Sequence, residues 1–211
     1  MKFMIVKKRY NSSKSWLRKH FSDKYVKQAH EKKLRSRAYF KLEEIQKKEK
    51  IFYPGMDVLD LGSSPGSWSQ YAAKCIQPHG YVIACDILPM KPMINVKFFQ
   101  GDIRKTVLQD IFNSIDTTNI QVVMSDMAPN ISGIPNIDIP NTIYLVESAL
   151  KISVKVLSDK GSFLVKIFQG EGFNESFKKI SLFFRKVKII KPNASYLTSR
   201  EVYILAKQRK L

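Results

Sequence analysis

Four ionisable side chains of this sequence stand at positions where a charge needs an explanation. Lys166 lies inside an apolar run, and a lysine is expensive to bury unless it is paired. Asp126 follows another apolar run, Glu201 opens the last one, and Lys41 lies beside the apolar face of a predicted helix. Each residue alone is explained by a side chain that reaches solvent. Together, two lysines and two carboxylates could orient a hydroxyl group or take up its proton, but their spacing does not show that they meet.

A glycine-containing loop follows the first predicted strand. Segment 60–68 reads DLGSSPGSW, in which Gly62 and Gly66 allow a tight turn and a close approach of the backbone to a ligand. A phosphate-binding P-loop would need Gly-Lys-Ser/Thr, and a dinucleotide fingerprint would need G-x-G-x-x-G. The loop has neither pattern, which disfavours a nucleotide triphosphatase and an NAD-dependent enzyme.

Two aspartates follow the next predicted strands and narrow the choice of ligand. Asp86 ends the second strand, where a carboxylate can accept both hydroxyl hydrogens of a ribose. Asp102 follows the third strand, where an adenine amino group would fall. The ligand implied is an adenosine without a pyrophosphate, and S-adenosylmethionine fits because nearby carboxylates favour its sulfonium cation. The alternative is that both aspartates only form turns at strand ends.

Short apolar runs alternate with helical patterns, which predicts an α/β fold with a mostly parallel sheet covered by helices on both faces. Ligands bind such sheets at the carboxyl ends of the strands, where the loop and the aspartates lie. The predicted strands are 57–61, 81–85, 96–99, 121–125, 162–167, 187–190 and 202–206. Helices are predicted over 68–76, 140–157 and 173–184, and one more helical face is formed by Leu34, Ala38, Leu42 and Ile45.

Positive charge is concentrated in the first quarter of the chain. The formal net charge is +18, and residues 1–50 hold 17 lysines and arginines against five acidic residues. Nucleic acid or an anionic membrane is the partner that such a charge fits, and a Lys-rich composition or a solvated helix face is the alternative explanation. Tyr39, Phe40 and Tyr196 could stack an extruded base, although core packing is the expected role of Phe40. We expect RNA phosphate contacts at Lys32, Lys33, Arg35, Arg37, Lys186 and Lys188.

Several classes of protein are disfavoured by what the sequence lacks. The cysteines are Cys75 and Cys85, with no CxxC pair, so we expect no disulfide scaffold, no zinc site and no other metal. No apolar run is long enough to span a membrane, and Met1–Val6 is too short for a secretory signal. We therefore expect a cytoplasmic protein with no membrane partner.

The order and spacing of these motifs closely resemble the bacterial FtsJ-type family of ribosomal RNA 2′-O-ribose methyltransferases. The resemblance runs from about Ser15 to the C-terminus, in segments 35–45, 60–68, 84–90, 100–102, 122–130, 165–172 and 199–204. It implies a Rossmann-like S-adenosylmethionine-dependent methyltransferase fold, with a seven-stranded sheet whose last strand is antiparallel. Residues 1–50 would then be an RNA-facing arm and helix packed on a methyltransferase domain at 51–211, with one structural domain overall.

The resemblance also implies roles for individual residues. The K-D-K-E tetrad of the family falls on Lys41, Asp126, Lys166 and Glu201 without substitution. The family loop often reads Pro-Gly-Gly-Trp, and Ser67 replaces its second glycine, where it would either strain a positive φ or cap the following helix. Contacts to S-adenosylmethionine fall on Gly62, Gly66, Ser67, Trp68, Asp86, Asp102 and Asp126.

The substrate implied by the resemblance is a uridine ribose of 23S rRNA in the large (50S) ribosomal subunit, methylated by a monomer. A ribose 2′-hydroxyl is a poor nucleophile because it keeps its proton near neutral pH. We expect Lys166 to be the base or the hydroxyl-orienting group, positioned by Asp126, while Lys41 and Glu201 steer the ribose or the lysine. Two alternatives stay open: a 2′-O-methyltransferase of tRNA or of an mRNA cap, and a non-catalytic RNA-binding ribosome-assembly factor.

Overall fold

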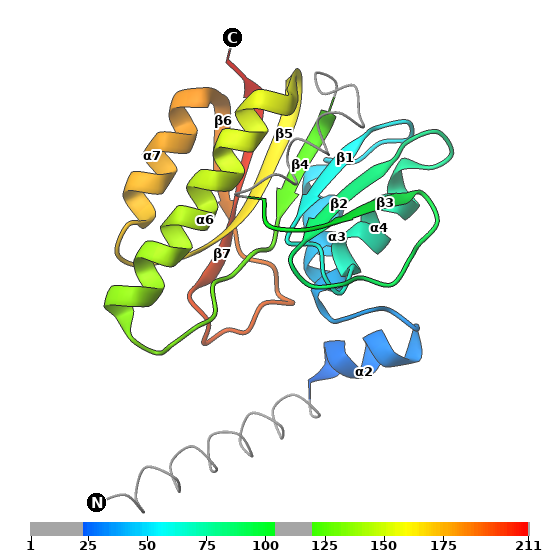
Figure 1. The fold of residues 1–211 in the computed structure, drawn as a ribbon, viewed down its shortest axis with the longest axis horizontal. Coiled ribbons are helices and arrows are strands. Elements are labelled where there is room, and N and C mark those ends of the chain that lie inside the picture. The colour runs from blue at the N-terminus through cyan, green and yellow to red at the C-terminus, as the bar shows by residue number, and fades with distance from the viewer. Residues whose placement is uncertain (1–22, 104–119, 211) are drawn as a thin grey trace, which may run out of the picture.

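The computed structural model describes residues 23–103 and 120–210. Within them, a seven-stranded sheet has helices on both of its faces (Figure 1). The strands are β1 (Val58–Leu61), β2 (Val82–Asp86), β3 (Val96–Gln100), β4 (Ile120–Ser125), β5 (Leu157–Phe168), β6 (Phe184–Ile190) and β7 (Glu201–Arg209). The helices are α2 (Lys24–Glu31), α3 (Ala38–Glu49), α4 (Ser67–Ile76), α6 (Pro135–Val156) and α7 (Phe173–Phe183).

The strand order places a ligand-binding crevice at the middle of the sheet. The order is β3-β2-β1-β4-β5-β7-β6, and β1 to β5 pair in parallel. Strand β7 runs antiparallel to both of its neighbours, β5 and β6. The direction of winding reverses between β1 and β4, and ligands of open α/β sheets bind outside the carboxyl ends of the strands at such a point. The predicted α/β fold, with its antiparallel last strand, is confirmed.

Each face of the sheet has its own hydrophobic core, because successive side chains of a strand point to opposite faces. Leu59 and Val123 belong to the core beneath α6 and α7. Val58 and Met124, one position away on the same strands, belong to the core that packs against α3 and α4. Figure 1 shows α6 and α7 in front of the sheet and α3 and α4 behind it. The face of the sheet on which a polar residue lies can therefore be read from its position along the strand.

Two helical segments begin elsewhere than the sequence predicted. Helix α6 begins at Pro135 rather than at Pro140, which lies inside it. Its early start is stabilised by Asp138, whose carboxylate accepts hydrogen bonds from the backbone N–H groups of Ser132 and Gly133 at 2.9 Å. The basic helical face predicted to begin near Leu34 is divided, because α2 ends at Glu31 and α3 begins only at Ala38. Residues 32–37 therefore form a connection between these two helices.

No helix within residues 23–103 and 120–210 is both long and apolar enough to cross a bilayer.

Candidate active site

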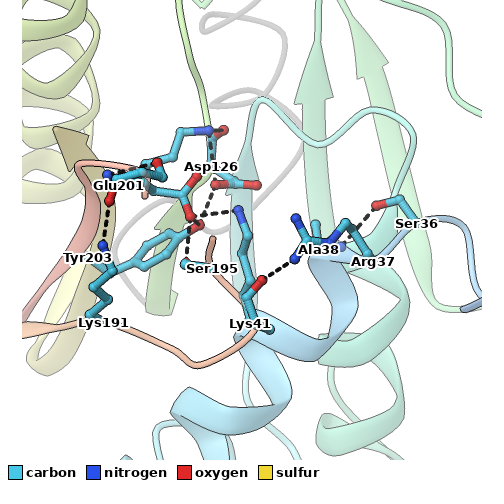
Figure 2. A network of polar contacts seen from close by, with 12 residues as sticks. Ser36, Arg37, Ala38, Lys41, Asp126, Lys191, Ser195, Glu201 and Tyr203 are labelled. Carbon is cyan, nitrogen blue, oxygen red and sulfur yellow. Dashed lines mark hydrogen bonds and ion pairs between the residues drawn. The ribbon is translucent and has the colours of Figure 1, made fainter. Parts of the chain in front are cut away.

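Four side chains predicted from the sequence meet at the end of β4, the end of β5 and the start of β7. Lys41 Nζ lies 2.7 Å from Glu201 Oε1. Lys166 Nζ lies 3.1 Å from Asp126 Oδ1 and donates to the main-chain oxygen of Asp126 at 2.5 Å. Both lysines are buried, and each is paired with a carboxylate from a different part of the chain. Figure 2 shows Lys41, Glu201 and Asp126 of this network. The cost of burying these charges is met by pairing, as expected for buried ions.

Tyr203 connects the two ion pairs. Its hydroxyl lies 2.8 Å from Asp126 Oδ1 and 3.3 Å from Glu201 Oε1, and Ser195 Oγ donates to the same Glu201 oxygen at 2.7 Å (Figure 2). Burial, followed by the charges of the two carboxylates, raises the pKa of Tyr203 well above its usual range, so the phenol acts as a hydrogen donor. Tyr203 is not among the site residues predicted from the sequence. The signal that could have found it is its position two residues after Glu201, on the same face of the strand.

Strand register explains why these residues converge. Lys166 on β5 is directly opposite Tyr203 on β7, and Phe168 is opposite Glu201. Both side chains of the first pair point to the face that carries α3, and α3 presents Lys41. Trp68 on α4 fills the space between, with its ring 5.5 Å from the Tyr203 ring and its Nε1 donating to the Ala38 carbonyl at 3.0 Å. A parallel and an antiparallel strand thus bring distant residues together at one edge of the sheet.

The charges of this network act on Asp126. Burial, the largest single influence, would raise the pKa of its carboxyl, and the positive charges of Lys166 and Lys41 oppose it. Hydrogen bonds from Tyr203 and Lys166 act in the same direction, and the pKa of Asp126 falls below its usual value. Asp126 is therefore a carboxylate at neutral pH, able to hold a cation or a hydrogen-bond donor.

A cavity of about 480 Å³ lies beside this network, at the carboxyl ends of β1, β2 and β4. Gly62 is in its wall with φ +76°, and a Cβ there would lie only 2.2 Å from the Met127 side chain. Both oxygens of Asp86 accept backbone N–H groups at 2.8 Å, from Ser64 and from Leu88, and each retains lone pairs for a ligand. The predicted cofactor residues that line this cavity are Gly62, Asp86, Asp102 and Asp126.

The other predicted cofactor residues, Gly66, Ser67 and Trp68, lie next to the cavity rather than in its lining. Gly66 is the residue that needs a positive φ, at +103°, and it precedes the first turn of α4. Ser67 does not strain the backbone, because it is the first residue of α4 and does not have a positive φ. It does not cap α4 either, because Gly66 occupies the N-cap position, and the Ser67 hydroxyl lies 2.7 Å from Ser36 Oγ. Both alternatives expected for Ser67 are therefore wrong: the serine joins α4 to the connection that leads into α3.

Arg35 is turned toward the protein and not toward solvent as the helical pattern suggested. One of its guanidinium nitrogens donates to the Pro65 carbonyl at 2.9 Å. The other donates to the carbonyls of Lys91 and Pro92 at 2.8 and 3.0 Å. The guanidinium thereby ties the glycine loop after β1 to the loop after β2. A Cβ at Gly66 would lie 2.7 Å from the end of the Arg35 side chain, so a larger residue there would displace Arg35 and would also be strained by the positive φ of +103°.

The remaining predicted RNA contacts are four exposed lysines, one of them paired, and a paired arginine. Lys32 and Lys33 are exposed after α2, and Lys186 and Lys188 are exposed on the edge strand β6. Lys188 Nζ lies 2.5 Å from Glu49 Oε1, so its charge already has a partner within the protein. Edge-strand lysines also prevent pairing with other chains, which is an independent reason for their presence. Arg37 is not on an exposed helix side, because its side chain is only 15 % exposed and pairs with a carboxylate.

The sheet order β3-β2-β1-β4-β5-β7-β6, with paired lysines and carboxylates beside a cavity at the switch point, is the arrangement of the Rossmann-like methyltransferase fold. Residues 34–209 match the FtsJ-like methyltransferases, and the chain belongs to that family. It is similar to the crystal structure of a Plasmodium falciparum protein assigned as a ribosomal RNA methyltransferase, with 28 % identity and a TM-score of 0.74. That match covers 83 % of this chain and 98 % of the other.

Proposed function

We propose that this methyltransferase transfers a methyl group from S-adenosylmethionine to a ribose 2′-hydroxyl of RNA, and that the target is a uridine of 23S rRNA in the large ribosomal subunit. The observation that carries the proposal is the network of Lys41, Asp126, Lys166 and Glu201 beside the cavity that Asp126 helps to line. Asp126 belongs to both the network and the cavity lining, so a methyl donor and a hydroxyl acceptor would meet there.

The residues of the cavity fit the proposed cofactor. Asp86 has both oxygens oriented by backbone N–H groups and lone pairs left for the hydroxyls of a ribose. Asp126 is held in its charged form and would attract a cationic methyl donor. When bound, S-adenosylmethionine supplies an electrophilic methyl group on a positively charged sulfur. Gly62 lets the loop in the cavity wall pack against Met127, since a Cβ at that position would lie 2.2 Å from the Met127 side chain.

Lys166 is the residue that we expect to contact the acceptor hydroxyl. An ammonium group has three hydrogens, and Asp126 engages the Lys166 nitrogen through its carboxylate and its main-chain oxygen. The third hydrogen of the ammonium can hold the 2′-hydroxyl oxygen in line with the methyl group. To take the hydroxyl proton instead, Lys166 must first be a neutral amine, whose nitrogen has a lone pair. A positioned base contributes about 10²- to 10⁴-fold to such a reaction. Lys41 and Glu201, joined to this pair by Tyr203, fix the other side of the acceptor site.

The choice of RNA is supported by charge and by similarity. The net charge of +18 favours a polyanion as the substrate. Exposed lysines such as Lys32 and Lys33 lie in the segment that leads into α3, the helix that carries Lys41. The similar Plasmodium falciparum protein is assigned as a ribosomal RNA methyltransferase. The network itself would serve any RNA ribose, so ribosomal RNA is the more specific part of the proposal.

The test is a panel of RNA substrates with labelled S-adenosylmethionine. Large ribosomal subunits that lack 2′-O-methylation, free 23S rRNA, tRNA and capped mRNA are incubated separately, and the products are digested to nucleosides. We expect 2′-O-methyluridine from ribosomal RNA in the large subunit. Label on tRNA or on a cap instead would overturn the ribosomal assignment, and label on a base atom would overturn the assignment of the ribose hydroxyl.

A further inference from the structure

Tyr196 is an aromatic residue that the fold leaves half exposed beside the active site. Its exposed fraction is 43 %, whereas Tyr39 and Phe40, the other aromatic residues considered for base stacking, are 7 % and 4 % exposed. Those two belong to the core that packs α3 and α4 against the sheet. The rings of Tyr39 and Phe40 are therefore not available to a ligand, and of the three aromatic residues Tyr196 is the one whose ring can be contacted.

The Tyr196 ring is fixed in place from one side. The Arg37 guanidinium carbon lies 4.0 Å from the ring centroid, so it covers one face of the ring. Arg37 is itself fixed, because its Nε lies 3.1 Å from Asp23 Oδ2 and it also donates to the Ala194 carbonyl at 2.5 Å. Asp23 also hydrogen-bonds the Tyr196 hydroxyl, and this bond together with burial raises the pKa of Tyr196. The exposed area must therefore lie on the edge and the opposite face of the ring.

The loop that carries Tyr196 is held at several points and borders the acceptor site. Glu44 on α3 accepts the backbone N–H groups of Asn193 and Ala194 at 2.7 and 2.9 Å. The residue before Tyr196, Ser195, donates to the Glu201 carboxylate that pairs with Lys41 (Figure 2). A rigid ring is thus placed one residue from the acceptor network. Little side-chain freedom remains to be lost when a planar ligand stacks on it.

We infer that Tyr196 is a stacking platform for a nucleobase of the RNA strand that enters the site. The inference rests on the proposed function, because it takes RNA as the substrate, and it adds a base-binding subsite to the ribose-binding network. Single-stranded bases stack on aromatic side chains with little dependence on sequence, since every base has a π-face. The underlying Arg37 is paired with Asp23, so the platform binds the base and leaves phosphate binding to the exposed lysines.

The test separates base stacking from phosphate binding and does not need catalysis. The probes are a short oligouridylate and an abasic ribose-phosphate oligomer of the same length, which present the same phosphates. The parent protein should bind the oligouridylate roughly five- to a hundredfold more tightly than the abasic oligomer. Tyr196→Ala should bind the two probes about equally, whereas Tyr196→Phe should keep most of the difference because the ring remains over Arg37.

Leu197→Ala is the matched control, since Leu197 is the next residue of the same loop, is 92 % exposed and carries no ring. It should keep the preference of the parent protein, and all variants should keep the cofactor affinity and the thermal unfolding midpoint. The inference is overturned if the parent does not distinguish the probes or if Tyr196→Ala still does. If the protein methylates no RNA but still shows a preference for the oligouridylate that depends on Tyr196, the proposed function is refuted and the stacking inference is not.

Discussion

The buried carboxyl group of Asp60 should make this protein more stable in mildly acidic than in mildly alkaline solution. Asp60 lies in β1 with no exposed surface. Ser69 Oγ donates to its Oδ2 at 2.5 Å, while Oδ1 has no hydrogen-bond partner within the part of the chain that the structure describes. Burial, with contributions from the negative charges of Asp126 and Asp86, raises the pKa of Asp60 to about 7.

The sign and size of the effect follow from comparing the folded and unfolded chains. An aspartate in an unfolded chain has a pKa of about 3.9. Between about pH 4 and pH 7 the folded protein therefore binds one proton more than the unfolded chain at Asp60, and the free energy of unfolding falls as the pH rises through this window. With these two pKa values, Asp60 lowers the free energy of unfolding by about 2.5 kcal/mol between pH 5 and pH 8.

The assay is urea unfolding at pH 5 and pH 8 of the parent, of Asp60→Asn and of Asp159→Asn. The asparagine at position 60 does not titrate, so Asp60→Asn should become more stable relative to the parent by about 2.5 kcal/mol on going from pH 5 to pH 8. Asp159, whose side chain is 66 % exposed, is the surface control, and its variant should differ from the parent equally at both pH values. A difference between Asp60→Asn and the parent that does not change with pH would refute the argument from burial.

Three further outcomes are expected. Arg35→Lys keeps the positive charge but loses the planar guanidinium group that donates to three carbonyls. It should weaken cofactor binding about five- to fiftyfold and change RNA affinity less than about twofold, with both affinities measured by titration calorimetry. Tyr203→Phe should lower the free energy of unfolding by roughly 1.5–3 kcal/mol in urea, because the Asp126 carboxylate loses a buried hydrogen-bond donor at 2.8 Å. Replacing Lys32 and Lys33 by Ala should reduce the slope of log affinity against log salt by roughly 1.5 if both contact single-stranded phosphates, and an unchanged slope would remove them from the RNA surface.

The sheet and the cofactor cavity were predictable because they depend on local patterns. Parallel strands buried on both faces are mostly apolar, so β1, β2 and β4 stood out as short, largely apolar runs even though β1 contains Asp60. A polar residue ends or follows each of these runs. That residue is at the carboxyl end of a strand, and the positions of Asp86 and Asp126 in the cavity wall follow from this rule. The convergence of Lys41 and Glu201 was implied only by family resemblance, because it depends on how α3 packs against the sheet.

The hydrogen-bond partners of Arg35 and Arg37 could not be predicted, because they depend on which distant segments the tertiary structure brings close to each guanidinium group. Arg35 and Arg37 looked like members of an exposed basic face, yet carbonyls from distant loops bind both guanidinium groups. The start of α6 was misplaced for a similar reason. Pro140 usually marks a boundary, but the hydrogen bonds that Asp138 accepts begin the helix one turn earlier.

The central claim is that Lys166 acts on the ribose hydroxyl during methyl transfer. The most direct measurement is the single-turnover rate of methyl transfer from S-adenosylmethionine to large ribosomal subunits that lack the modification, for the parent, Lys166→Met and Lys160→Met. Lys160 lies on the same strand, β5, but is exposed at its other end. We predict that Lys166→Met binds the cofactor and loses about 10²-fold or more of the rate, while Lys160→Met keeps it. A Lys166→Met protein that transfers methyl at close to the parent rate would contradict the account.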